Sequence, residues 1–547
     1  MGEETETEAK LSRDSLTMHA FVTGSTGAGK SNTVWEILNQ LRRNYKTPFL
    51  VIEPAKGEYK NVLGGLPDVT VYGTNPKKFD NLLRLNPFRF PADVHVLEHL
   101  DRLVEVFNVC WPMYAAMPAV LKEAMEKAYE AAGWDLALSE NPKGSVYPTF
   151  ADVLDKIEEV IEISRYSADT KGDYIGSLCT RVRSLANGLN GLIFCKEDLP
   201  DEELFDRNVI VDLSRIGSVE TKALIMGLLV TKLNEYRSGG SPRLGGDKLS
   251  HVTVLEEAHN LLKRTSTEQT AESSNLLGKS VELLANSIAE MRAYGEGFII
   301  ADQSPGLMDM SVIRNTNTKI ILRLPDQSDR ELAGYAAGLD EEQIRELAKL
   351  ERGVAAVYQN DWVEPALIKI NKCGIHGKAY EPSGGASTAD PKAIKKHIVH
   401  LLLGDRLKNR LEFDVDAIEK GLSSLDIPTG CVDFIEEAID EYRKTKKLAV
   451  WRDDNFKKLS HWLVRLLDIR TRTRRCVLAA RDNDELTEKL GAAVREAAPG
   501  VDESAVLELC HCALRDMSAS AEAGETLEAE KIYRAWYDSR REGGKAL

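Results

Sequence analysis

A glycine-rich stretch near the start of the chain constrains its fold more than any other feature. Residues 24–31 read GSTGAGKS and fit the pattern G-x-x-x-x-G-K-[ST]. An apolar run, HAFVTG (19–24), precedes the stretch, and a helical pattern, NTVWEILNQLRRN (32–44), follows it. A strand that turns through glycines into a helix presents backbone amides and a helix N-terminus, and both bind phosphate groups. The stretch therefore predicts a nucleotide site at the end of a strand.

The polar positions of this stretch have expected roles. Lys30 is expected to reach the β- and γ-phosphates of ATP, and Ser31 is expected to coordinate Mg²⁺. The predicted nucleotide-binding residues are Gly24, Gly27, Ala28, Gly29, Lys30, Ser31 and Asn32. Such a phosphate cradle indicates the class of ligand but not the reaction, because different phosphoryl-transfer enzymes share it.

Apolar runs recur along the first two thirds of the chain, with helical patterns between them. Nearly continuous runs are typical of strands that are buried on both faces of a parallel sheet. Further runs are PFLVIEP (48–54), VTVYG (69–73), VIVDLS (209–214), HVTVLEE (251–257), GFIIADQS (297–304) and TKIILRL (318–324), with VAAVY (354–358) and PALIKI (365–370) as expected edge strands. The alternation predicts an α/β fold with a mainly parallel sheet.

Composition divides the chain into a series of predicted parts. Residues 1–17 predict a polar tail, and residues 18–372 predict the α/β core. Helical spacing predicts a helical insertion at 79–204, between the third and fourth strands. The Gly, Ser and Pro residues of 373–392 predict a linker, and amphipathic patterns predict a helical C-terminal domain over 393–547.

Bulk properties exclude some classes of protein. The 547 residues are 43% hydrophobic, and no apolar run approaches the roughly 18 residues of a membrane span. The acidic N-terminus lacks the features of a secretory signal, so we expect a cytoplasmic protein without a membrane partner. The eight cysteines form no C-x-x-C pair, which favours free thiols over a zinc site. A net charge of −15 argues against a broadly basic surface but not against a local basic groove.

Two adjacent glutamates end one predicted buried strand, in TVLEEAHNLL (253–262). Ligands bind beyond the carboxyl ends of strands in open α/β sheets, so both carboxylates are expected beside the phosphate cradle. We expect Glu256 to hold Mg²⁺ through a water and Glu257 to activate the water that attacks the γ-phosphate. The alternative is a pair of solvated surface charges.

Two further side chains are predicted to act on the γ-phosphate. Gln303 follows the strand in GFIIADQSP (297–305) and is expected to sense the phosphate, with a loop residue of no special role as the alternative. Arg292, in AEMRAYGEG, is expected at a helix end, from which an arginine can be supplied across a subunit interface. A solvated helix-end arginine is the alternative, and Arg314 is a rival for the same role.

The order of these motifs resembles that of the HerA-type ATPases of the HerA–FtsK superfamily. The resemblance covers about residues 18–372 and rests on GSTGAGKSNT, VIEPAKGEY, VIVDLS, TVLEEAHNLL, MRAYGEGFIIADQSP, NTNTKIILRL and LERGVAAV. It implies a RecA-like core that assembles as a hexameric ring and pumps double-stranded DNA through a central channel. It also implies a nuclease or another effector as a frequent partner.

The resemblance implies the same roles for the glutamate pair, for Gln303 and for Arg292. It also matches Glu53 and Glu58 to acidic positions to which no role is assigned. HerA proteins usually carry a β-barrel domain before the phosphate cradle, whereas only residues 1–17 precede the first strand here. We therefore expect either a fragment or a variant without the barrel.

Three segments are candidates for contacts with DNA, because a motor grips the phosphate backbone through Lys, Arg and polar loops. They are KRTSTEQTAESSN (263–275), RYSADTKGDYIGSLCTRVRS (165–184) and IRTRTRR (469–475). The alternative for each is solvated surface, or for the last a charge cluster at a helix end.

The leading hypothesis is an ATP-hydrolysing ring motor that uses Mg²⁺ and translocates or unwinds double-stranded DNA. A second hypothesis is an assembly or regulatory ATPase of a multi-protein complex, for example in antiviral defence, without processive DNA movement. The unmatched C-terminal region, 393–547, favours some partner binding and keeps this alternative open. A small-molecule kinase is disfavoured because Glu257 is expected to face water and no Arg-rich acceptor lid is evident.

Overall fold

The chain folds into two compact units in a computed structural model. The first unit takes the residues up to Ser145 together with Lys156–Cys179 and Asp198–Ala386, and the second takes Val146–Asp155, Thr180–Glu197 and the residues from Ser387 on. The structure describes residues 7–111, 113–114, 116–239, 248–264, 276–375, 379–382, 391–407, 411–422, 425, 427–450, 453–520 and 526–542. Two stretches of the predicted insertion thus group with the C-terminal helices.

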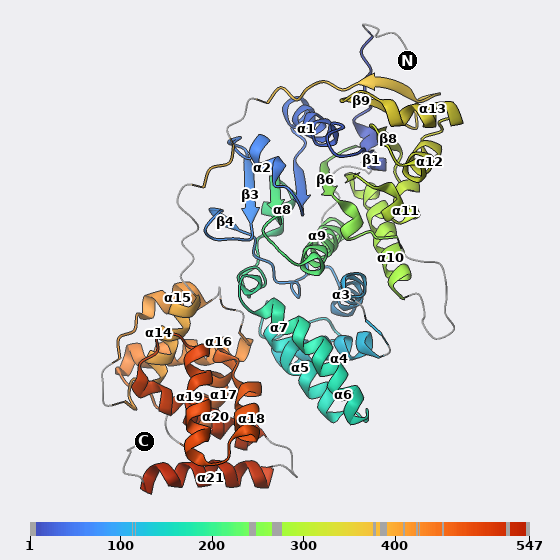
Figure 1. Cartoon of the computed structure of the whole chain (residues 1–547). Helices are drawn as coiled ribbons and strands as arrows, with labels where there is room; N and C mark the ends of the chain where they lie inside the picture. The colour runs from blue at the N-terminus through green and yellow to red at the C-terminus, as the bar shows by residue number, and fades with distance from the viewer. Residues whose placement is uncertain are drawn as a thin grey trace. The chain divides into compact units, whose positions relative to one another are not determined.

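A mainly parallel sheet forms the centre of the first unit (Figure 1). Within the described residues its ten strands pair in the order β10-β9-β8-β1-β7-β6-β2-β5-β3-β4. The strands are β1 (Ala20–Thr23), β2 (Phe49–Glu53), β3 (Val69–Gly73), β4 (Asn81–Leu82), β5 (Asn208–Asp212), β6 (His251–Glu256), β7 (Glu296–Asp302), β8 (Thr318–Ile321), β9 (Val354–Tyr358) and β10 (Ala366–Lys369). Only the β8–β9 and β9–β10 pairs are antiparallel among these strands. The predicted α/β class is confirmed, and every predicted strand occurs.

Burial explains why the strand pattern was readable in the sequence. Strands β1, β2, β6 and β7 are buried along their whole length, and most of their side chains are apolar. The edge strand β10 instead alternates between half-buried and exposed residues. The two-residue strand β4 is too short to give a pattern, and the sequence did not predict it.

The strand order brings three functional segments to one edge of the sheet. Strand β7 lies between β1 and β6 and is parallel to both. The register aligns Thr23 with Asp302 on one side, and Ala301 with Glu256 on the other. The residues that follow these three strands therefore leave the sheet side by side, at the edge where α/β folds bind ligands.

The first unit contains helices that pack against the sheet and helices that belong to the insertion (Figure 1). They are α1 (Lys30–Gln40), α2 (Glu58–Val62), α3 (Val96–Cys110), α4 (Met117–Ala132), α6 (Ala168–Tyr174), α8 (Asp201–Phe205), α9 (Val219–Gly239), α10 (Leu276–Glu290), α11 (Met310–Arg314), α12 (Gln327–Ala336) and α13 (Glu341–Glu346). Helix α1 confirms the helix predicted after the glycine-rich stretch, but it begins at Lys30, inside that stretch and before the predicted pattern at 32–44.

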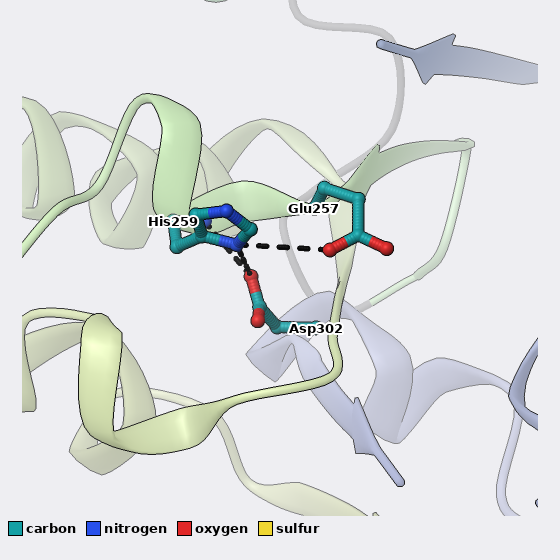
Figure 2. Close-up of side chains that lie close together, drawn as sticks. All are labelled: Glu257, His259 and Asp302. Atoms are coloured by element: carbon teal, nitrogen blue, oxygen red, sulfur yellow. Dashed lines mark hydrogen bonds and ion pairs between the residues drawn. The ribbon is translucent and has the colours of Figure 1, made fainter. Parts of the chain in front are cut away.

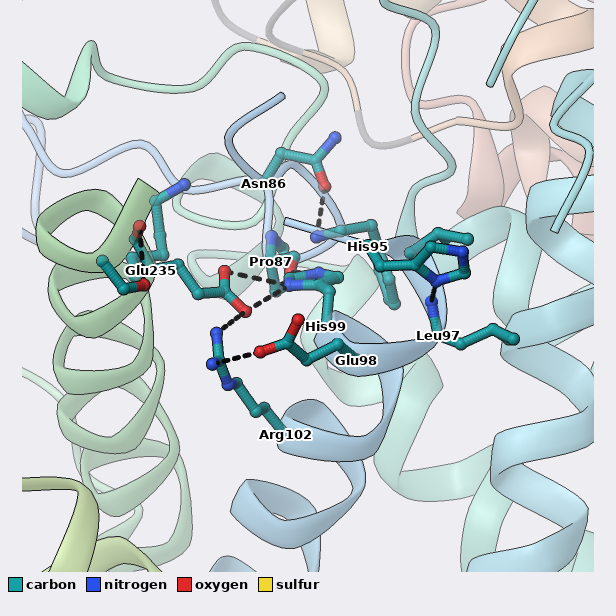
Figure 3. A network of polar contacts seen from close by, with 12 residues as sticks. Asn86, Pro87, His95, Leu97, Glu98, His99, Arg102 and Glu235 are labelled. Carbon is teal, nitrogen blue, oxygen red and sulfur yellow. Dashed lines mark hydrogen bonds and ion pairs between the residues drawn. The ribbon is translucent and has the colours of Figure 1, made fainter. Parts of the chain in front are cut away.

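A buried polar network ties helix α3 of the insertion to helix α9 of the core (Figure 3). His99 Nδ1 lies 2.9 Å from Glu235 Oε1, and His99 Nε2 lies 3.1 Å from the carbonyl oxygen of Pro87. Arg102 contacts the same glutamate at 3.4 Å. Burial raises the pKa of Glu235, but the charge and hydrogen bond of His99, together with Arg102, outweigh it and hold this pKa below its usual range. The network fixes the orientation of the insertion helix on the core.

Where the structure describes the second unit, its regular elements are helices, and it has a hydrophobic core of its own, in which Trp536 is fully buried. Its helices are α7 (Thr180–Ala186), α14 (Pro391–Leu403), α15 (Val415–Leu422), α16 (Thr429–Thr445), α17 (Asp453–Leu467), α18 (Arg470–Ala479), α19 (Asn483–Ala497), α20 (Glu503–Ser520) and α21 (Thr526–Glu542), while α5 (Phe150–Ile163) has residues in both units. The predicted helical C-terminal region is confirmed. Among the described helices, none is both long enough and apolar enough to cross a membrane.

Candidate active site

The glycine-rich stretch leaves the N-terminus of helix α1 open. Gly29 precedes the helix with a φ of 117°, a left-handed conformation that suits glycine, and no side chain caps the helix. A Cβ on Gly24 would lie 2.8 Å from the Cβ of Leu322, which directly follows β8. The backbone at Gly24 therefore leaves no room for a larger residue at this position. The first-turn amides of a helix have no partner within the helix, and here they form a place for phosphate oxygens.

Lys30 is held by the two adjacent glutamates. Its Nζ lies 2.8 Å from Glu256 Oε2 and 3.7 Å from Glu257 Oε1, and all three side chains are largely buried. Burial lowers the pKa of Lys30, but the attraction of the two carboxylates and the hydrogen bond with Glu256 outweigh it and raise this pKa overall. The sequence predicted these three residues at one edge, and the structure brings them into contact.

An unusual backbone conformation lets both glutamates reach the same lysine. Neighbouring side chains of a strand point to opposite faces of the sheet. Glu257 directly follows strand β6 and has a φ of 47°, in the left-handed region that non-glycine residues rarely adopt. The turn brings its carboxylate to the side of Glu256. A left-handed residue that is not glycine costs about 1–2 kcal/mol, so the surrounding contacts hold the turn in place.

Gln303 bridges the phosphate cradle and the second glutamate. Its Oε1 accepts a hydrogen bond from the Thr26 hydroxyl at 2.6 Å, and its Nε2 donates to Glu257 Oε1. Because Gln303 directly follows β7, the strand between the cradle and the glutamates, its position is a consequence of the strand order.

A histidine and an aspartate flank Glu257, and the sequence did not single them out (Figure 2). His259 Nδ1 lies 2.9 Å from Asp302 Oδ2 and 3.7 Å from Glu257 Oε2. The hydrogen bond with Asp302 is the largest cause that raises the pKa of His259 above its usual value. The three groups lie within 4.8 Å of one another. Two sequence features could have identified these residues. Asp302 is an acidic residue at the end of a predicted buried strand, and His259 is the histidine of the E-E-A-H motif.

The stretch after strand β2 also reaches the site. Glu53 is buried and accepts hydrogen bonds from the backbone amides of Glu58 and Tyr59, at 2.6 Å and 3.2 Å. Burial raises the pKa of Glu53 to about 7 against these two hydrogen bonds. The side chains of Glu58 and Tyr59 contact Ser31 and Glu256. The sequence analysis assigned no role to Glu53 and Glu58 and did not identify Tyr59, which lies beside Glu58 in the stretch after β2.

Asn32 and Arg292 lie apart from this cluster. Asn32 Nδ2 donates to the carbonyl of Asn371 and its Oδ1 accepts from the amide of Cys373, both at 2.9 Å, so its amide group is engaged by the 371–373 segment. Arg292 is exposed in a short 3-10 helix (Met291–Tyr294) that precedes β7. It therefore lies at the amino end of the strand whose carboxyl end carries Gln303. Its rival Arg314 is also exposed and precedes β8.

The donor atoms at the site suit Mg²⁺. Ser31 supplies a hydroxyl oxygen and Glu256 a carboxylate, and hard oxygen donors are what Mg²⁺ takes in proteins, usually together with phosphate oxygens and water. Both side chains are linked to α2, which places them at the same edge of the sheet. The residues present therefore fit a magnesium–nucleotide complex.

The candidate DNA-binding segments differ in how far the structure describes them. Residues 265–275 lie outside the described residues, so most of 263–275 stays a prediction. In 165–184, Arg165 is exposed and Lys171 donates to the Glu162 carbonyl at 2.6 Å. In the 469–475 segment, Arg474 and Arg475 are exposed on α18.

Comparisons with known proteins agree with the motif order. A family model described as the central domain of helicase HerA matches residues 1–233. The DNA double-strand break repair helicase HerA of Sulfurisphaera tokodaii is 23% identical over 369 residues, which are 67% of this chain and 67% of that protein. The protein of the same name from Sulfolobus acidocaldarius is 24% identical over 402 residues, or 73% of each chain.

Among solved structures, VirB4 of Thermoanaerobacter pseudethanolicus aligns with a TM-score of 0.47 at 18% identity, covering 64% of this chain and 89% of that one. The family model and the two relatives carry the same assignment as the motifs between residues 18 and 372. The chain is therefore an ATPase-type enzyme that is similar to the HerA helicases over about two thirds of its length.

Proposed function

We propose that this chain is an ATP-driven motor that translocates or unwinds double-stranded DNA. The observation that carries the proposal is the meeting of Lys30, Glu256, Glu257 and Gln303 at the carboxyl edge of the sheet. This arrangement suits hydrolysis of ATP because a carboxylate stands beside a phosphate-binding lysine. The HerA relatives are named as DNA repair helicases, and these names support DNA as the polymer along which ATP hydrolysis drives movement.

The proposed reaction assigns a role to each side chain. Lys30 leaves the glutamates and binds the β- and γ-phosphates. Glu257 accepts a proton from the attacking water, and Gln303, which contacts both Thr26 and Glu257, orients that water against the γ-phosphate. Ser31 and Glu256 would hold Mg²⁺, which would neutralise charge on the phosphate oxygens.

We further propose that copies of the chain act together in a ring, with six as the expected number. The exposed position of Arg292 supports this, because β7 has seven residues and separates the arginine from its own phosphate cradle by about 20 Å. An arginine at that end is available to the nucleotide of a neighbouring copy, where it would stabilise charge in the transition state.

The motor proposal is tested by the response of ATP hydrolysis to DNA. Turnover by the full chain should rise with duplex DNA, and it should rise further as the duplex lengthens from shorter than one footprint to several footprints. The measurement belongs at low salt, because contacts with phosphates weaken steeply as salt rises. Single-stranded DNA of equal length is the matched control. Turnover that is the same with and without duplexes of every length would contradict DNA movement.

A second candidate function is an assembly or regulatory ATPase that organises an effector protein such as a nuclease. The helical second unit favours it, since this unit has its own hydrophobic core and supplies surface for a partner. Hydrolysis that DNA does not stimulate, in a protein that still assembles with ATP, would favour this candidate. Particle imaging with an ATP analogue, with and without duplex DNA, measures that assembly directly.

A further inference from the structure

Helix α2 contacts both groups that are proposed to hold Mg²⁺. Glu58 Oε2 accepts a hydrogen bond from the Ser31 hydroxyl at 2.9 Å, and the hydroxyl of the next residue, Tyr59, donates to Glu256 Oε1 at 2.6 Å. We propose that Glu58 and Tyr59 are positioning residues that orient Ser31 and Glu256 toward Mg²⁺. This inference rests on the proposed ATPase function and extends it to the residues behind the two metal-side oxygens.

The contact between Tyr59 and Glu256 is buried and specific. Tyr59 is 1% exposed and Glu256 is 6% exposed, so water does not compete for the hydrogen bond. The bond engages Oε1 of Glu256, while Lys30 engages Oε2. When Lys30 turns to a phosphate, Tyr59 still holds Oε1, and the carboxylate keeps its orientation with Oε2 free.

The contact between Glu58 and Ser31 acts on the hydroxyl in a matching way. A serine hydroxyl has one proton to donate and two lone pairs with which to accept or to coordinate. Because Ser31 donates its proton to Glu58, its lone pairs are left for a cation. A carboxylate acceptor strengthens this effect, since hydrogen bonds to charged groups are shorter and stronger than neutral ones.

Helix α2 is itself held firmly by the core. It has only five residues, so it would not persist without tertiary contacts. The Glu53 carboxylate accepts from its first two amides, and Lys60 Nζ contacts Asp212 Oδ2 at the end of β5 at 2.5 Å. The consecutive residues 58, 59 and 60 thus contact helix α1, strand β6 and strand β5. A segment tied at so many points transmits its own position to the side chains that it touches.

The alternative is that Tyr59 has only a structural role in the core, and that its hydroxyl bonds Glu256 because a buried hydroxyl needs a hydrogen-bond partner. That alternative predicts a loss of stability that is the same with and without metal. Positioning predicts a change in the dependence on Mg²⁺, because partners behind a metal ligand typically contribute about 10- to 100-fold to metal affinity.

The test uses the full chain, a non-hydrolysable ATP analogue and a titration with Mg²⁺. The readouts are the Mg²⁺ concentration that gives half of the increase in unfolding temperature, and the affinity for the analogue in EDTA. For Tyr59→Phe we expect the Mg²⁺ midpoint to rise about tenfold or more, with the affinity in EDTA within twofold of wild type. Tyr72→Phe is the matched control, because Tyr72 is also buried and its hydroxyl contacts Glu203 outside the site at 3.4 Å.

A second pair of variants still tests the inference if Tyr59→Phe does not fold. The Glu58 side chain is 39% exposed, so Glu58→Ala should fold and should raise the Mg²⁺ midpoint, whereas Glu58→Gln retains an acceptor oxygen for Ser31 and should restore most of the affinity. Midpoints for Tyr59→Phe and Glu58→Ala that equal that of Tyr72→Phe would overturn this inference alone. A wild-type chain that Mg²⁺ and the analogue do not stabilise would overturn the proposed function, and this inference with it.

Discussion

Replacement of Glu257 by glutamine separates nucleotide binding from hydrolysis. The change keeps the size of the side chain and removes its charge, so the residue can no longer accept a proton from water. A positioned general base typically contributes about 10²- to 10⁴-fold to a rate. We therefore expect the kcat of Glu257→Gln to fall by about this factor, which corresponds to about 3–5 kcal/mol of transition-state stabilisation.

The affinity for ATP should be unchanged or higher in the same variant. Glu257 Oε1 lies 3.7 Å from Lys30 Nζ and competes with phosphate for that lysine. An ion pair at about 4 Å attracts by at most about 4 kcal/mol at an effective dielectric constant of 20, and the substitution removes this competing attraction. Gln303 still finds an acceptor, because glutamine retains one amide oxygen.

The assay is single-turnover hydrolysis together with direct binding of a fluorescent ATP analogue. Glu282→Gln, which makes the same change at an exposed position on α10, is the matched control and should behave like wild type. Turnover by Glu257→Gln within threefold of wild type would refute the assignment of the base. A loss of ATP binding would show instead that the residue supports the cradle.

Two more predictions concern the opposite edge of the sheet. The Arg292→Ala variant should lose most ATP hydrolysis when it is assayed alone. Mixing it with Glu257→Gln should restore activity, because a mixed ring pairs an intact site with an intact arginine of the neighbouring copy. Mixtures that are as inactive as either variant would rule out an arginine that acts between copies. His19 is buried, and burial lowers its pKa from 6.5 to about 4, so the unfolded chain takes up the proton first as pH falls. The stability that this residue contributes is present above pH 6.5 and falls by about 3 kcal/mol toward pH 4. The His19→Asn variant should show a shallower loss of unfolding free energy over the same range, and parallel curves for the two proteins would contradict this prediction.

Local patterns were enough to predict every strand except β4, and also the phosphate cradle. Strands β2, β5, β6 and β7 are buried on both faces, and such burial leaves continuous apolar runs that a sequence shows directly. The cradle is equally local, because its glycines, lysine and serine occupy eight consecutive positions, residues 24–31. The pairing of Lys30 with the glutamates followed from the rule that ligands lie at the carboxyl ends of strands.

The contacts between distant segments were not predictable in this way. Tyr59 and Glu256 are separated by 197 positions, and the runs that contain them do not encode which strands are neighbours. The left-handed conformation of Glu257 could not be predicted from the sequence either, because glutamate is not a residue type that favours a positive φ. The turn that directs both carboxylates to one lysine is therefore a property of the folded chain, set by the contacts around it.

The pairing of Lys30 with Glu256 has a consequence for how ligands enter. A phosphate that takes the lysine leaves Glu256 Oε2 without the counter-charge that Lys30 supplies. A divalent cation replaces that counter-charge. Metal and nucleotide thus favour one another's binding, and thermodynamic reciprocity requires that each raises the affinity for the other by the same factor. A nucleotide without metal, or a metal without nucleotide, is a weak ligand for such a site.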